Sequence, residues 1–292
     1  MEVVDCLRKR LGVIPGLSRG RSLYDSRTSD RVTPEALQTM QTAIETIALT
    51  RTFGQFTAVD QLELSVPVGT FFGFLGPNGA GKSTTIKMLT GLIRITAGKA
   101  KILGRDIESD PIVVKKQIGV VPEELALFDR LTGPEHLVFV GRMYGLQKET
   151  IRTRSAELLE LMSLHDEPKK LIVDYSHGMK KKLSLAAALI HDPKVLFLDE
   201  PFEGIDAVAS RMIKDLLGSL VSRGVTIFLT SHILEIVEKL CSKVAVIHQG
   251  RLVAHGKTEE LRQGEQTSSL EEVFLDLVGA EDTPTKVLSW LS

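Results

Sequence analysis

The sequence predicts an α/β fold with a mostly parallel sheet, an antiparallel β portion and a helical insertion. From about residue 44, short and continuously apolar runs alternate with segments of helical periodicity. That alternation is typical of parallel strands covered by helices on both faces. A glycine-rich turn joins one such run to a helical segment. Residues 125–175 lack strong strand patterns, so we expect them to form an insertion made of helices.

The individual elements follow in chain order. Strands are predicted for the apolar runs at residues 44–49, 61–66, 70–75, 117–121, 195–198 and 225–229. Helices are predicted where apolar residues recur every three or four positions, at residues 82–92, 134–144, 149–164, 180–190, 208–221 and 232–240. The pair Gln249-Gly250 separates the apolar runs 243–248 and 251–255, which predicts a β-hairpin.

Composition divides the chain into three parts: an N-terminal extension (1–43), a main domain (44–264) and a helical tail (265–292). Residues 1–33 hold seven basic and four acidic residues, and residues 15–34 are rich in Gly, Ser, Arg and Asp. This composition predicts a flexible extension. The apolar residues of segment 3–11 have helical spacing beside three basic residues, so a short membrane-surface helix is the alternative.

The overall composition excludes several classes of protein. The 292 residues are 43% apolar and 25% charged, with a net charge of −1. These values argue against a disordered chain and against a nucleic-acid binder that works by bulk positive charge. Two cysteines form no disulfide framework, which favours a reducing compartment. No stretch reaches the roughly 18 apolar residues of a membrane span, so any membrane role is expected to come through a partner chain.

The strongest functional signal is a phosphate-binding loop at residues 76–83. It fits the pattern G-x-x-x-x-G-K-[ST] and lies between a predicted strand and a predicted helix. Glycines let successive backbone N–H groups point at one anion, and the helix N-terminus adds partial positive charge. Lys82 is expected to reach the terminal phosphates, and Ser83 to offer its hydroxyl to Mg²⁺. The nucleotide-binding residues predicted here are Gly76, Pro77, Asn78, Gly79, Ala80, Gly81, Lys82, Ser83 and Thr84.

A second signal is the acidic pair Asp199-Glu200 at the end of the apolar run 195–198. In a parallel sheet, ligands bind beyond the carboxyl ends of the strands. Asp199 is therefore a candidate ligand of the hydrated Mg²⁺ beside Ser83, and Glu200 a candidate base that polarises water. Phosphoryl transfer needs positioning and charge compensation above all, which this pair supplies together with Lys82.

These motifs give the chain its resemblance to a known family. Over about residues 46–260 the sequence resembles the nucleotide-binding subunit of an ATP-binding cassette (ABC) transporter, which has a P-loop NTPase core and a helical subdomain. The resemblance implies that the helical subdomain covers about residues 124–178. It also implies that Phe53 stacks on the adenine, with Phe56 as the rival candidate.

Further residues fall in the order of the family's motifs. Residues 175–179 resemble the family's Leu-Ser-Gly-Gly-Gln signature, which implies that Ser176 and Gly178 contact ATP held by a second protomer. His177 replaces a glycine of that signature and Met179 a glutamine. Asp206 resembles a residue of the loop that crosses the dimer interface, and its alternative role is the N-cap of the helix that follows.

Two more candidates complete the set. His232 follows the predicted strand 225–229 and resembles the switch histidine that contacts the γ-phosphate, which adds it to Glu200 and Lys82 as catalytic candidates. Glu123 stands where the family usually has glutamine. A carboxylate is a suitable hard-oxygen ligand, so Ser83, Glu123 and Asp199 are the expected Mg²⁺ ligands.

The resemblance implies an ATPase subunit that powers transport across a membrane. Two chains would sandwich two ATP molecules, and the helical subdomain would transmit closure to an integral-membrane permease at the cytoplasmic face. His177, the Pro122-Glu123 pair and the tail residues 270–274 resemble antibiotic- and multidrug-export members of the family. An importer subunit, a soluble ABC ATPase and an ATP-sensing subunit without turnover are the alternatives. No nucleic-acid partner is expected.

Overall fold

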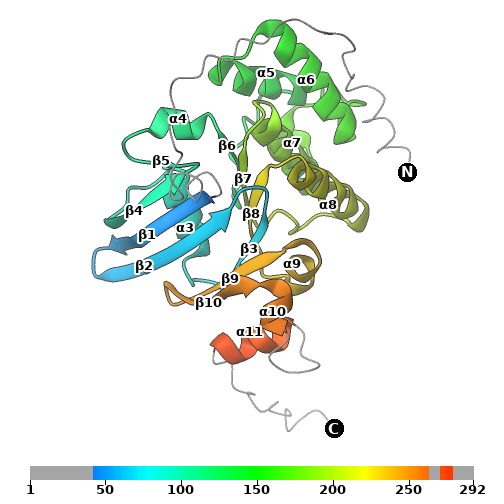
Figure 1. Ribbon diagram of the computed structural model, residues 1–292. Coiled ribbons are helices and arrows are strands. Elements are labelled where there is room, and N and C mark those ends of the chain that lie inside the picture. The colour runs from blue at the N-terminus through cyan, green and yellow to red at the C-terminus, as the bar shows by residue number, and fades with distance from the viewer. Residues whose placement is uncertain (1–41, 263–269, 279–292) are drawn as a thin grey trace, which may run out of the picture. The chain divides into compact units, whose positions relative to one another are not determined.

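The structure is a computed structural model that describes residues 42–262 and 270–278, in which the strands form two sheets (Figure 1). The predicted extension lies outside the described residues except for Thr42 and Ala43, which begin the first strand. The alternative membrane-surface helix at residues 3–11 lies outside them entirely. Of the predicted tail, only residues 270–278 are described, and they form a helix.

The larger sheet has six strands in the order β10-β9-β3-β8-β7-β6. Their bounds are β3 (Phe71–Leu75), β6 (Ile118–Val121), β7 (Val195–Asp199), β8 (Thr226–Thr230), β9 (Lys243–His248) and β10 (Arg251–Lys257). All neighbours pair in parallel except β9 and β10, which form the predicted hairpin. Gln249 and Gly250 both have positive φ at its turn, as a tight hairpin turn requires. The mostly parallel sheet is confirmed.

The smaller sheet is antiparallel and has the order β2-β1-β4-β5. It comprises β1 (Thr42–Phe53), β2 (Phe56–Pro67), β4 (Ala97–Ile102) and β5 (Arg105–Asp106). The first two strands are about twice as long as predicted, and β4 and β5 were not predicted at all. In β4 only Ala100 and Ile102 are buried, so the apolar signal is too short to identify a strand from periodicity.

The helices lie close to their predicted positions. They are α3 (Lys82–Leu89), α5 (Gly133–Met143), α6 (Lys148–Leu161), α7 (His177–Leu189), α8 (Ala207–Ser222), α9 (Leu234–Leu240), α10 (Thr258–Arg262) and α11 (Leu270–Val278). Three short elements were not predicted, namely α4 (Pro111–Lys115), the 3-10 turn η1 (Ile172–Asp174) and α10. Helices α5 and α6 lie side by side next to α7 (Figure 1), which confirms a helical insertion.

Two apolar cores lie on the two faces of the larger sheet. Phe72 and Phe74 of β3 join the core shared with α3 and the smaller sheet. Phe71 and Leu75 point to the other face and join the core shared with α7, α8 and α9. Since both faces are covered, strands β3, β7 and β8 are buried at every position. Burial on both sides explains why these segments are continuously apolar in the sequence.

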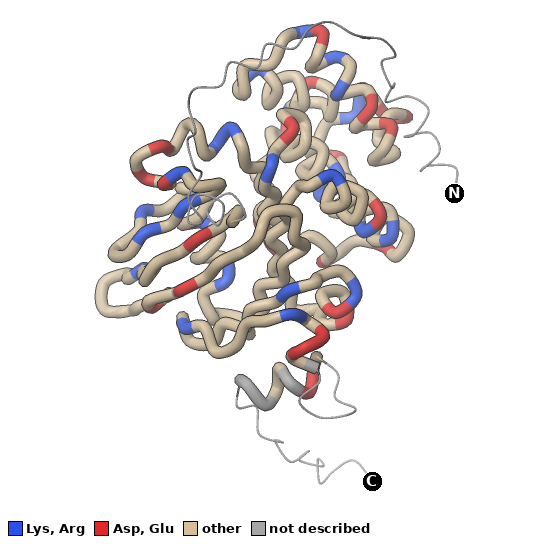
Figure 2. The backbone as a smooth tube through the Cα atoms, in the orientation of Figure 1, with Lys and Arg blue, Asp and Glu red and all other residues tan. Residues whose placement is uncertain are grey.

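Charges of both signs are interspersed along the described helices and strands (Figure 2), with no broad basic field among them. This distribution agrees with the net charge of −1. Within the same part of the chain, no helix combines the length and the apolar character needed to cross a bilayer.

Candidate active site

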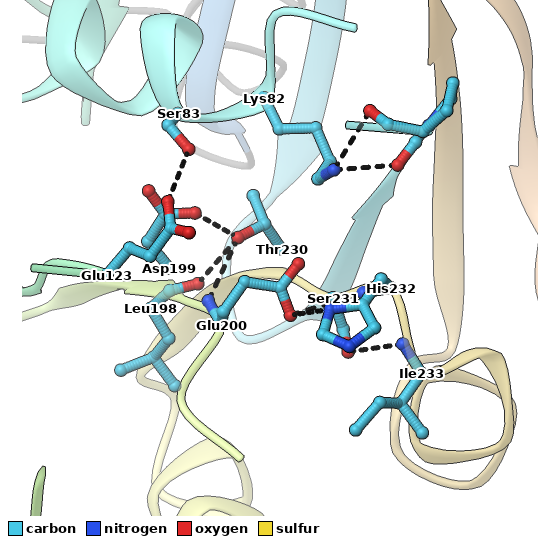
Figure 3. A network of polar contacts seen from close by, with 12 residues as sticks. Lys82, Ser83, Glu123, Leu198, Asp199, Glu200, Thr230, Ser231, His232 and Ile233 are labelled. Atoms are coloured by element: carbon cyan, nitrogen blue, oxygen red, sulfur yellow. Dashed lines mark hydrogen bonds and ion pairs between the residues drawn. The ribbon is translucent and has the colours of Figure 1, made fainter. Parts of the chain in front are cut away.

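Four segments meet at one edge of the larger sheet, where the parallel strands β3, β6, β7 and β8 end. The loop after β3 leads into α3, the segment after β7 carries Glu200, and the segment after β8 carries His232. Glu123 lies two residues beyond β6. Figure 3 shows Lys82, Ser83, Glu123, Asp199, Glu200 and His232 gathered in this region. The sequence predicted this convergence from the parallel order of the strands.

The glycine-rich loop wraps tightly between β3 and α3. Gly79 and Gly81 have φ angles of 78° and 107°, a region that other residues rarely adopt. A Cβ atom at Gly81 would lie 2.5 Å from the carbonyl oxygen of Ala58, so this position also lacks room for a side chain. The backbone therefore approaches Ala58 closely at Gly81, directly before the N-terminus of α3, where partial positive charge attracts an anion.

Lys82 occupies the first position of α3 and is buried. Its Nζ atom donates hydrogen bonds to the carbonyl oxygens of Gly76 at 2.7 Å and Pro77 at 3.2 Å. The ammonium group thus lies in the concave side of the loop. Because its hydrogen-bond partners are neutral carbonyls, the charge is available to a phosphate brought into the same loop.

Ser83 and Glu123 come together across the site. The hydroxyl of Ser83 donates to Oε2 of Glu123 at 3.4 Å. Asp199, which is 4% exposed, accepts a hydrogen bond from Thr230 Oγ1. Figure 3 shows Asp199 beside this pair. The arrangement places one hydroxyl and two carboxylates next to each other, and such hard oxygen donors suit Mg²⁺.

Glu200 pairs directly with His232. Its Oε2 atom lies 2.9 Å from Nδ1 of His232 and accepts a hydrogen bond from the His232 backbone N–H at 3.2 Å. The Glu200 side chain is 8% exposed, whereas that of His232 is 52% exposed. Two contacts therefore hold the Glu200 carboxylate against His232, the second residue after β8.

The predicted helix 180–190 begins earlier than expected. Helix α7 starts at His177, and Ser176 is its N-cap, with the hydroxyl accepting from the Met179 N–H at 3.2 Å. Gly178 therefore lies in the first turn of the helix, and not in a loop before it. The side-chain cap explains the early start, because Ser at this position satisfies a free backbone donor.

Asp206 is the N-cap of α8, as one of the two sequence interpretations proposed. Its Oδ1 atom accepts hydrogen bonds from the N–H groups of Val208 and Ala209, both at 2.9 Å. These bonds lower the pKa of the Asp206 carboxyl group, and the bond from Ala209 contributes most. A role at a dimer interface remains a prediction.

Phe53 and Phe56 lie opposite each other at the end of the β1–β2 hairpin. The guanidinium of Arg51 lies 4.3 Å from the centroid of the Phe53 ring. The structure leaves Phe53 46% exposed and Phe56 65% exposed, and adenine stacking remains a prediction for both.

Two polar residues of the site escaped the sequence analysis. Thr230, at the end of β8, donates to Asp199 and also accepts from the Glu200 N–H at 3.2 Å. Lys181, in the second turn of α7, donates from Nζ to the backbone carbonyl oxygen of Glu200. Thr230 directly precedes Ser231-His232, so the pattern that indicated His232 could also have indicated Thr230. Lys181 stands in a run of three lysines, which alone indicates an exposed helix face.

Comparisons with known proteins give one consistent result. A family model described as ABC transporter matches residues 59–203. The daunorubicin/doxorubicin resistance ATP-binding protein DrrA of Streptomyces peucetius is 41% identical, over 75% of this chain and 67% of the relative. The linearmycin resistance ATP-binding protein LnrL of Bacillus subtilis is 40% identical, over 77% and 75% respectively. A solved structure of an ATP-binding subunit of an ABC transporter superposes with a TM-score of 0.76 at 30% identity, covering 81% of this chain and 99% of that one.

Proposed function

We propose that this chain, which belongs to the ABC transporter family, is the subunit whose ATP hydrolysis powers an exporter. We also propose that the residues at the strand ends perform that hydrolysis. The chain is an ABC-type ATPase by its family and its relatives. The observation that carries the assignment of residues is the Glu200–His232 pair beside the glycine-rich loop, at one edge of the sheet.

The arrangement supports a direct mechanism for ATP + H₂O → ADP + phosphate. The loop amides and the Lys82 ammonium bind the β- and γ-phosphates. The Glu200 carboxylate accepts a hydrogen bond from the attacking water and orients it in line with the bond to be broken. His232 keeps that carboxylate in place through its ring and its backbone N–H. Water loses its proton towards Glu200 as the γ-phosphoryl group is transferred.

Mg²⁺ fits the oxygen groups of this site. The protein ligands proposed are Ser83, Glu123 and Asp199, which supply a hydroxyl and two carboxylates. No cluster of three or more His, Cys, Asp or Glu with metal-ligand geometry occurs in residues 42–262 and 270–278. That finding is compatible with Mg²⁺, which is usually bound through one or two carboxylates plus substrate phosphates and waters. When bound, the ion neutralises charge on the phosphate oxygens.

Replacement of Glu123 by alanine tests its proposed contact with the metal. The variant is expected to need about tenfold more Mg²⁺ for half-maximal ATPase activity, the lower end of the loss typical of groups that support a metal site. Titration of phosphate release with Mg²⁺ at saturating ATP measures this shift. Glu124→Ala is the matched control, because Glu124 is the next residue and its side chain is exposed. An unchanged Mg²⁺ requirement in Glu123→Ala removes the residue from the ligand set.

The complete site is proposed to need two chains. Ser176 and Gly178 lie at the N-terminus of α7, where a hydroxyl and free backbone N–H groups are suited to bind the γ-phosphate held by a second protomer. We propose a dimer that closes on two ATP molecules and reopens after hydrolysis. Phe53 is the proposed adenine platform, and Asp206 the proposed interface residue.

The partner proposed for the dimer is an integral-membrane permease at the cytoplasmic face of the membrane. The helical subdomain offers it an apolar surface formed by Phe128, Phe139 and Met143, which are 51%, 40% and 73% exposed. Phe128 and Phe139 pack edge to face with ring centroids 4.8 Å apart. Two relatives are named for drug resistance, which supports export as the direction of transport.

Affinity capture from detergent-solubilised membranes tests this assignment. The tagged chain is expected to retain a protein with several membrane-spanning segments, and Met143→Asp to reduce that capture at least tenfold while ATP hydrolysis by the purified chain stays within about twofold. Val253→Asp on β10 is the matched control, since Val253 is also exposed but lies on another element. Retention of ribosomes or DNA in place of a membrane protein would contradict the proposal. Co-purification of a solute-binding protein would instead indicate an importer.

A further inference from the structure

A buried lysine in α7 has no role in the mechanism so far. Lys181 is 3% exposed, although long charged side chains are almost never buried to this extent unless paired. Its Nζ atom donates to the backbone carbonyl oxygen of Glu200. Burial lowers the pKa of Lys181, and the carboxylates of Glu203, Glu200, Glu123 and Asp199 act against that shift. The ammonium group therefore lies among the acidic side chains that surround the proposed reaction centre.

The backbone at Glu200 is in a conformation that needs support. Its φ angle of 49° is in the left-handed region, which costs a residue with a side chain conformational energy. On one side, the Glu200 N–H donates to Thr230, through Oγ1 at 3.2 Å and the carbonyl oxygen at 3.3 Å. On the other side, the Glu200 carbonyl accepts from Lys181. The same carbonyl also accepts a longer bond from the Glu203 N–H at 3.4 Å. These hydrogen bonds hold the peptide groups on either side of the Glu200 side chain.

The same helix contacts the segment after Glu200 a second time. Gly204 has a φ angle of 68°, and a Cβ atom there would lie 2.8 Å from the His177 ring. Helix α7 therefore touches the segment through His177 at its first turn and through Lys181 at its second. The first of these contacts involves the residue that replaces a glycine of the signature.

We propose that Lys181 is a positioning residue for ATP hydrolysis, whose ammonium group holds the Glu200 backbone so that the carboxylate faces the attacking water. The inference rests on the proposed role of Glu200 as the base. The proposed role of Lys181 also links the signature segment, residues 175–179, to ATP hydrolysis by the same chain. Helix α7 presents Ser176 to the ATP of the partner protomer, and one turn further on it fixes the Glu200 that acts on its own ATP.

Replacement of Lys181 by methionine removes the charge and the donor while keeping an unbranched side chain. Because the Lys181 side chain is buried, a replacement of similar shape is required. The variant is expected to lose at least tenfold in kcat, with KM for ATP within threefold of wild type. Lys180→Met is the matched control, because the Lys180 side chain is partly exposed. Its Nζ atom lies 3.8 Å from Oδ1 of Asp129. It is expected to keep its kcat within twofold.

A double-mutant cycle separates positioning from a purely structural role. If Lys181 acts through Glu200, adding Lys181→Met to Glu200→Gln is expected to reduce the single-turnover rate by less than twofold, since the group that it positions has already gone. A further tenfold loss in that background would overturn the inference. Thermal unfolding checks the fold of each variant, and Lys181→Leu repeats the comparison with different packing if the methionine variant unfolds.

The outcomes also distinguish this inference from the proposed function. A folded Lys181→Met variant with kcat within twofold of wild type would overturn the role of Lys181, while Glu200→Gln remained inactive. Full turnover by Glu200→Gln would instead overturn the base role of Glu200, on which the inference depends.

Discussion

Replacement of Glu200 by glutamine is expected to reduce kcat for ATP hydrolysis by about 10²–10⁴-fold, the range typical of a lost general base. The amide keeps the size of the side chain but accepts a proton from water far less readily. ATP binding is expected to persist, because Lys82 and the loop amides are untouched. The proposed closed dimer is then expected to accumulate, since in that proposal hydrolysis reopens the dimer. Phosphate release measures the rate, and sedimentation with Mg-ATP measures the dimer.

The control for this change is Glu157→Gln. Glu157 is an exposed carboxylate on α6, and none of the described contacts joins it to Glu200 or His232. Its replacement is expected to keep kcat within about threefold of wild type, which excludes a general effect of removing negative charge. Normal turnover by Glu200→Gln would exclude the base role and leave the Glu200–His232 contact without a catalytic explanation.

Replacement of Lys82 by methionine is expected to weaken ATP binding about ten- to a hundredfold. A hydrogen bond to a charged group contributes about 1.5–3 kcal/mol, and each 1.4 kcal/mol corresponds to a factor of about ten in affinity. The methionine keeps the apolar part of the buried side chain but cannot bind the phosphates. Equilibrium titration with a fluorescent ATP analogue in the presence of Mg²⁺ measures the change in Kd.

Lys87→Met is the comparison for Lys82→Met. Lys87 lies on the same helix α3 but is exposed, so its loss is expected to leave Kd within about twofold of wild type. Thermal unfolding of both variants shows whether the loop has lost its fold, since Lys82 also bonds the carbonyl oxygens of Gly76 and Pro77. An unchanged Kd in folded Lys82→Met would exclude phosphate binding by this ammonium group.

The larger sheet was predictable from sequence because its strands are buried on both faces. Strands β3, β7 and β8 have no exposed position, so they appear as uninterrupted apolar runs. Their parallel order then places Glu200, His232 and the glycine-rich loop at one edge. Local sequence and global topology agree at these positions, which explains why their convergence at one edge is predictable from the sequence.

The features that escaped prediction depend on tertiary contacts. Strand β4 has only two buried residues, and it is stabilised by its pairing with β1, which is distant in sequence. Lys181 is buried because helix α7 packs towards Glu200, whereas its sequence context indicates an exposed face. None of these contacts leaves a periodic pattern in the sequence.

Equilibrium binding of labelled ATP to the purified wild-type chain, with and without Mg²⁺, tests most directly whether the strand ends form a nucleotide site. We predict saturable binding of one ATP per chain, strengthened by Mg²⁺ and displaced by ADP. A folded chain that takes up no labelled nucleotide when Mg²⁺ is present would contradict the assignment of every residue around the glycine-rich loop.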